Sequence, residues 1–234
     1  AGTDFTGSLL LGHQTTGTLD AATYNTGVGL TALDALTTGD HNTAVGYAAL
    51  TSNTTGTKNT AFGYDALYTN EQGTANVAIG FQSLRANTFG SSNVAIGFAS
   101  FYTNTRSYYN TAIGTGSLQY ANRTADSDGY NTALGSYAGN TGTNNITTGN
   151  KNTLLGASTA ASAAAGTNQS VIGYGASGQA NNSVTLGNAD VTAVYMAQDK
   201  GATVYAAGMV ISDDGTIGSE SDANAIAISS CGVV

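Results

Sequence analysis

The chain has 234 residues and a formal charge of −8 at pH 7, and only 9% of its residues are charged. Its six basic residues are scattered singly, so we expect neither a nucleic acid nor an anionic membrane surface as partner. No apolar run approaches the ~20 residues that span a bilayer, which argues against membrane insertion. The single cysteine, Cys231, cannot form a disulfide within the chain.

A five-residue phrase, typified by NVAIG at residues 76–80, returns along most of the chain. Its closing glycines lie 17 residues apart from Gly12 to Gly114, and the later steps are 21, 21, 17 and 14 residues. Such near-constant spacing is typical of a repeat architecture in which each repeat forms one unit of a stack. The central repeats close at Gly29, Gly46, Gly63, Gly80, Gly97 and Gly114.

Each phrase places a large apolar residue directly before the glycine and a small residue before that. This alternation predicts a β-strand whose larger side chains lie on the inner face. A leucine four residues after the glycine, such as Leu50 or Leu67, is expected to be a second inward anchor. A second glycine column, which includes Gly56 and Gly73, marks a second turn, so we expect two strands of about four to six residues per repeat.

Two strands and two turns per 17-residue repeat predict an all-β fold, a β-solenoid or β-roll over residues 1–190. Residues 191–234 are expected to form a C-terminal strand or cap segment, with strands over 191–196 and 203–211. The asparagines that open the phrase should stack along the solenoid and hydrogen-bond to one another. In the central repeats these are Asn42, Asn59, Asn76 and Asn93.

An aromatic residue follows the glycine in several repeats, as at Tyr47, Tyr64, Phe81 and Phe98. Its spacing does not fit the inner face, so it either turns into the coil or lines a contact between chains. Three rolls packed on one axis would bury surface that a single thin roll leaves exposed. The pattern therefore favours a homotrimer, with a monomeric solenoid as the alternative.

The phrases at residues 93–97 and 182–187 resemble the head repeats of trimeric autotransporter adhesins. The longer form ending in Gly-Tyr-x-Ala-Leu, at 46–50 and 63–67, looks more like the shaft repeats of phage and viral tail fibres, and residues 184–208 look like the end of such a shaft. The resemblance covers roughly residues 8–211 and implies a parallel trimer of left-handed β-rolls. Neither the heptads of the adhesin stalk nor the self-cleaving chaperone domain of many tail fibres is matched.

The resemblance implies a structural fibre segment of a virus or phage particle, extracellular and on the virion surface, that presents or contributes to host attachment. Its partners would be further copies of itself and other virion or fibre proteins. The alternatives are a bacterial surface adhesin and a self-assembling extracellular filament. An ice-binding solenoid is more remote, because its threonine column is expected to share a face with the core.

No arrangement of residues suggests catalysis, since His13 and His41 are the only histidines. We therefore expect neither enzyme activity nor a cofactor. Asp126 and Asp128 begin like a calcium loop but lack the downstream glutamate, and an ordinary turn is the simpler interpretation.

Aromatic and arginine side chains crowd the first longer repeat and suit contact with the sugar rings of a host-surface glycan. Ordinary packing is the alternative explanation. The candidates for receptor contact are Tyr102, Arg106, Tyr108, Tyr109 and Tyr120.

Overall fold

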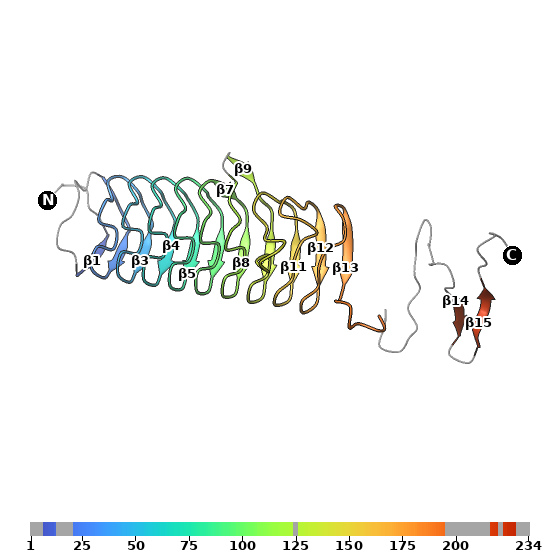
Figure 1. Ribbon diagram of the computed structural model, residues 1–234. Coiled ribbons are helices and arrows are strands. Elements are labelled where there is room, and N and C mark those ends of the chain that lie inside the picture. The colour runs from blue at the N-terminus through green and yellow to red at the C-terminus, as the bar shows by residue number, and fades with distance from the viewer. Residues whose placement is uncertain (1–6, 13–20, 124–125, 195–215, 220–221, 228–234) are drawn as a thin grey trace. The chain divides into compact units, whose positions relative to one another are not determined.

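The computed structural model divides the chain into two compact units, Ala1–Thr192 and Ala193–Val234. The first unit is a β-solenoid whose coils follow one another along the stack (Figure 1). Neither unit contains a helix in its described part, so none of those residues forms an apolar helix of membrane-spanning length. The residues that the structure describes are 7–12, 21–123, 126–194, 216–219 and 222–227.

Eleven short strands form one parallel sheet in which the strand order equals the chain order. Each strand lies in register with the same phrase one repeat later, so that Thr43 pairs with Thr60 and Val45 with Phe62. The strands are β1 (Leu9–Leu11), β2 (Thr26–Val28), β3 (Thr43–Val45), β4 (Thr60–Phe62), β5 (Val77–Ile79), β6 (Val94–Ile96), β8 (Thr111–Ile113), β10 (Thr132–Leu134), β11 (Thr153–Leu155), β12 (Gln169–Ile172) and β13 (Ser183–Leu186). The predicted all-β solenoid of stacked 17-residue coils is confirmed, whereas its left-handedness and trimeric state stay predictions.

The expectation of two strands per coil was wrong, because most coils have one strand of three residues. The return side passes through turns in which Ala48 and Leu50 both have left-handed φ angles, 54° and 53°. A strand needs strongly negative φ, so residues in this conformation end it. The exceptions are β7 (Ser107–Tyr108) and β9 (Ser127–Asp128), which pair in parallel outside the main sheet, beside the first longer repeat (Figure 1).

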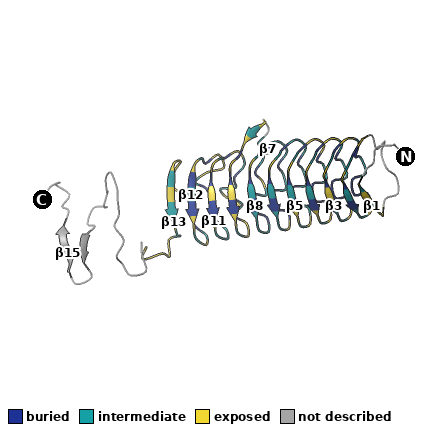
Figure 2. Ribbon diagram, turned by 180° about the vertical axis from the view of Figure 1, so that it is seen from behind, coloured by how far each residue is buried: buried dark blue, intermediate teal, exposed yellow. Residues whose placement is uncertain are grey.

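The direction of the strand side chains was also predicted wrongly. The central residue of the strand is the buried one, for example Ala61 and Ala78, while Phe62 before the glycine is 57% exposed. Figure 2 shows buried and exposed residues following one another within the strands. A coil only one sheet and one turn wide has little interior space, and the return side supplies the large side chain that fills it. In the first six complete coils these are Leu33, Leu50, Leu67, Leu84, Phe101 and Leu118.

The asparagines that open the phrase are buried and stack as a ladder. Asn76 Nδ2 donates to Asn59 Oδ1 at 3.2 Å and to the Gly90 carbonyl at 2.8 Å. Asn76 Oδ1 accepts from the backbone N–H of Asn93 at 3.0 Å. Each side chain therefore links two coils and also satisfies buried backbone groups at the turn, which would otherwise destabilise the coil.

A second ladder, which the sequence analysis missed, runs along the other turn. Asn70 Nδ2 donates to Asn53 Oδ1 at 2.8 Å, and Asn87 Nδ2 donates to Asn70 Oδ1 at 2.7 Å. The same side chains donate to the carbonyls of Gly73 and Gly90. The signal was present in the sequence, because these asparagines precede the second glycine column by three residues.

The second unit has a described hairpin of β14 (Thr216–Ser219) and β15 (Asp222–Ala227), which pair antiparallel. Of the strand predicted over 191–196, the structure describes residues 191–194, and these residues do not form a strand. The strand predicted over 203–211 lies outside the described residues.

Successive coils approach closely at the closing glycines, as they also do at the second glycine column. A Cβ added to Gly63 would lie 2.6 Å from the carbonyl oxygen of Gly80, closer than a side-chain carbon can approach backbone oxygen. The φ of Gly63 is +138°, a conformation that only glycine adopts readily. The glycine column therefore sets the distance between coils.

We expect Gly63→Ala to lower the free energy of unfolding by more than about 3 kcal/mol, because it adds a backbone clash to an unfavourable φ. Gly142→Ala is the matched control: φ is +90° there, but nothing lies within 4 Å of the added Cβ. It should cost only about 1 kcal/mol, from backbone conformation alone. Thermal unfolding followed by circular dichroism compares the two, and equal losses would contradict the close-contact explanation.

Candidate self-association face

The solenoid carries an exposed apolar column along the strands. It consists of the last strand residue of each coil, directly before the glycine, which is apolar in all eleven strands. Phe62 is 57% exposed, Leu134 44% and Ile172 39%. The members are Leu11, Val28, Val45, Phe62, Ile79, Ile96, Ile113, Leu134, Leu155, Ile172 and Leu186. We call this set the strand column.

A second exposed column lies two residues further along each coil, across the glycine. Tyr47, Tyr64, Phe81 and Phe98 stack face to face in successive coils, with ring centroids 4.9, 5.2 and 5.3 Å apart. These rings are between 42% and 56% exposed, and Leu30 extends the row by one coil at 40%. We call these five residues the aromatic column.

The aromatic column is interrupted after Phe98, since Thr115, Ser136 and Ala157 take its place in the next three coils, before an exposed Tyr174 occupies the position again. The strand column continues past that point to Leu186. The apolar surface is therefore broad over the first half of the stack and narrower over the second half.

The size of this surface makes it a candidate for association with other chains. Soluble monomers seldom leave a contiguous apolar surface of this kind uncovered. Fully burying one large apolar side chain contributes roughly 1.5–3 kcal/mol. If about ten half-exposed side chains of the two columns are covered, the gain is on the order of 10 kcal/mol before the cost of association. No charged residue interrupts either column.

The residues predicted for receptor contact have different ring and arginine partners in the structure. Tyr102 lies beside Arg85, whose guanidinium stands 5.9 Å from the centre of the Tyr102 ring. Arg106 instead lies over the Phe89 ring at 4.3 Å. Tyr120 is 45% exposed in the segment that follows β8. Tyr102 and Arg106 therefore take part in different arginine–ring contacts.

Tyr108 and Tyr109 remain together, with a third ring that the sequence analysis did not select. The Tyr109 ring stacks on Tyr130 at 5.3 Å with an interplanar angle of 6°, and Tyr108 approaches Tyr109 in a tilted geometry at 6.3 Å. Burial raises the pKa of the Tyr108 hydroxyl above its usual value. Tyr109 and Tyr130 occupy equivalent positions in successive coils. The four extra residues between Gly114 and Gly135 shift their spacing in the sequence, so this equivalence was not recognised there.

The two candidate calcium ligands are each engaged with a protein group. Asp126 Oδ1 accepts a hydrogen bond from Arg106 Nη1 at 3.0 Å. Asp128 accepts one from the Tyr130 hydroxyl, which raises the pKa of Tyr130. No group of three or more histidine, cysteine, aspartate or glutamate side chains gathers within the described ranges.

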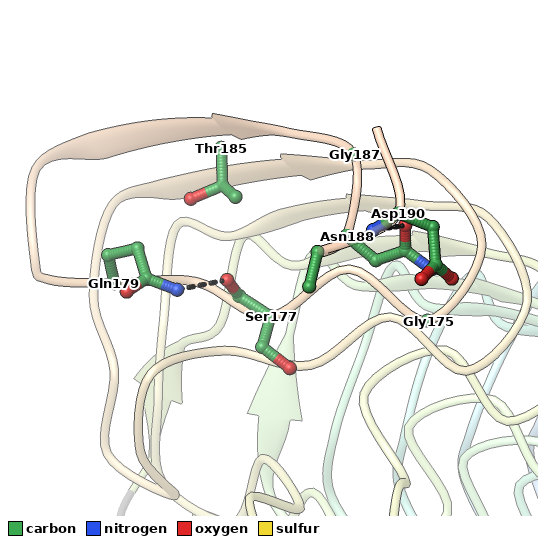
Figure 3. A pocket seen from close by; sticks show the side chains of 8 residues that line it. Gly175, Ser177, Gln179, Thr185, Gly187, Asn188 and Asp190 are labelled. Carbon is green, nitrogen blue, oxygen red and sulfur yellow. Dashed lines mark hydrogen bonds between the residues drawn. The ribbon is translucent and has the colours of Figure 1, made fainter. Parts of the chain in front are cut away.

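A hollow of about 580 Å³ lies at the end of the stack, beside β13 (Figure 3). Its polar groups satisfy one another: Gln179 Nε2 donates to the Ser177 carbonyl at 3.0 Å, and Asn188 Nδ2 donates to Asp190 Oδ2 at 3.2 Å. Asp190 is its only ionisable side chain, so the hollow has neither an acid–base pair nor an activated nucleophile. Its lining is Gly175, Ser177, Gln179, Thr185, Gly187, Asn188, Ala189 and Asp190.

No protein-family model, curated protein or solved structure matches this chain. The resemblance to fibre and adhesin repeats therefore rests on the repeat phrases alone, and the function has to be argued from the geometry of the surface.

If the two columns are covered by other copies of the chain, a charge placed at their centre should dissociate the assembly. We expect Phe81→Glu to give a monomer in sedimentation equilibrium at concentrations where the unaltered chain is oligomeric, because a buried carboxylate without a partner is strongly unfavourable. Thr55→Glu adds the same charge at an exposed turn away from both columns and should leave the mass unchanged. An oligomer that survives Phe81→Glu would contradict the assignment of this face.

Proposed function

We propose that this protein is a structural segment of an extracellular fibre, a stiff rod that acts as a homotrimer. The observation that carries the proposal is the apolar strand column, which runs uninterrupted along the outside of all eleven strands. A solenoid that leaves this much apolar surface outside its own core needs a partner of the same length. A second and third copy of the chain meet that requirement.

The stack of coils suits a mechanical role. Every strand hydrogen-bonds to the next one, and two asparagine ladders tie the turns together. Coils in a parallel sheet repeat at about 4.8 Å, so ten steps give a solenoid on the order of 50 Å long. Bending such a unit requires breaking several parallel rows of hydrogen bonds at once, which supports a spacer or shaft role.

Three copies related by a rotation axis provide closed association. In a parallel, in-register trimer the strand columns of all copies run side by side for their whole length, and the symmetry leaves no apolar face uncovered. The repeat phrases that resemble tail-fibre shafts support the same arrangement. The place on a virus or phage particle, and a contribution to host attachment, follow from that resemblance alone.

Ice binding is a second candidate because one objection to it was mistaken. The threonine column, which includes Thr43, Thr132 and Thr153, faces outward, whereas the sequence analysis placed it with the core. Val77 and Val94 interrupt the column, and large apolar side chains stand beside it. A flat threonine array is therefore incomplete, and measurable thermal hysteresis would be needed to favour this function over the fibre.

The solution mass tests the proposal. Sedimentation equilibrium should give three times the chain mass of 23.3 kDa, and small-angle scattering should give an elongated particle. A particle of one chain mass across the accessible concentration range would refute the homotrimer. Long filaments in electron micrographs would replace it with end-to-end assembly through β1 and β13, the two terminal strands of the described sheet.

A further inference from the structure

One row of exposed residues stands at the turn that leads into the strands. Each member directly precedes a ladder asparagine and has a left-handed φ, such as 56° at Ala75 and 58° at Ser92. In six of the eight members the backbone N–H donates to a carbonyl one coil earlier, for example from Ser92 to Thr74 at 2.9 Å and from Tyr109 to Ser91 at 3.2 Å. We call this row the corner column: Tyr24, His41, Lys58, Ala75, Ser92, Tyr109, Tyr130 and Lys151.

Rings in the corner column stack wherever they occur in adjacent coils. Tyr24 and His41 are 5.1 Å apart, and Tyr109 and Tyr130 are 5.3 Å apart, both with nearly parallel planes. These distances are close to the coil repeat of about 4.8 Å. The spacing between successive residues of the column therefore matches the distance between two stacked rings.

Two neighbouring positions of the column carry small side chains. Ala75 and Ser92 are small and exposed, and they separate Lys58 from Tyr109. The Tyr109 ring, 51% exposed, has Tyr130 stacked on one face, and Tyr108 meets it in a tilted geometry. The small side chains of Ala75 and Ser92 therefore leave a gap in the row of rings, about two ring thicknesses long. The Tyr109 ring bounds one end of this gap.

The geometry points to a carbohydrate site at this gap, with one pyranose ring stacked on Tyr109 above Ser92 and Ala75. A pyranose presents an apolar C–H face of about the area of a tyrosine ring and a rim of hydroxyl groups. The Ser92 hydroxyl and the Lys58 ammonium can serve that rim, since both side chains are exposed in the same column. The ring of Tyr109 is rigid, so little conformational entropy is lost when a ligand stacks on it.

Other ring-shaped ligands fit the surface less well. A nucleobase brings phosphate charges, and the chain has a net charge of −8 with Lys58 as the one cation among the four residues at the gap. A flat apolar ligand would leave the Ser92 hydroxyl and Lys58 unused. A sugar uses both the apolar wall and the polar rim.

The site extends the proposed function, because it would let the fibre hold a cell-surface polysaccharide along its side. Its biological meaning rests on that function, but binding can be measured separately. Loss of the carbohydrate signal with an intact trimer would overturn only the site, whereas a monomer that binds sugar would overturn only the fibre.

The experiment is saturation-transfer-difference NMR on the full chain with the methyl glycosides of glucose, galactose, mannose and N-acetylglucosamine. At least one glycoside should receive saturation. Ser92→Phe should abolish the signal because it fills the gap with a protein ring, and Tyr109 shows that a ring is tolerated at this φ. Tyr109→Ala should weaken binding on the order of tenfold or more, as expected for the loss of one aromatic stack.

Tyr24→Ala is the matched control, since it removes an equally exposed ring from the other stacked pair of the same column. It should leave the signal unchanged. Melting curves for each variant establish that the solenoid is intact. The site is refuted if none of the four glycosides receives saturation, or if a folded Ser92→Phe or Tyr109→Ala variant keeps the full signal.

Discussion

The close approach of successive coils at the glycine column is the constraint on which the rest of the structure depends. Gly63 and its equivalents let each coil settle against the carbonyl of the next coil, a distance that no Cβ allows. The strands then pair in register, and every residue of the phrase stands above its counterpart. A single asparagine per repeat thereby becomes a continuous ladder, and a single apolar residue becomes a continuous stripe.

The narrow coil decides which stripe is buried. With Leu67 or its equivalents filling the interior from the return side, only alanine fits opposite, and the larger strand residues are left outside. The protein therefore has a thin apolar core with asparagine ladders at its turns, and it also carries an apolar face on its outside. This exposed face is the basis for the proposed self-association and, through it, for the proposed fibre function.

The period, the parallel register and the main asparagine ladder could be predicted, because equal spacing places equal residues above one another. The inward or outward direction of Phe62 could not, since alternation defines two faces without saying which is buried. The turn on the return side was missed because leucine and alanine rarely adopt positive φ, yet Leu50 and Ala48 do. For the candidate contacts, the ring partners could not be predicted: Tyr102 lies beside Arg85, whereas Arg106 lies over Phe89.

A tryptophan placed at Phe98, the most exposed ring of the aromatic column, tests the central claim most directly, because the chain has no tryptophan of its own. The account predicts blue-shifted emission that acrylamide quenches poorly in the assembled protein, and a red shift when Phe81→Glu is added to separate the copies. Emission and quenching like those of the unfolded chain, in protein that is folded and unaltered at Phe81, would show that the face is open to water and would contradict the account.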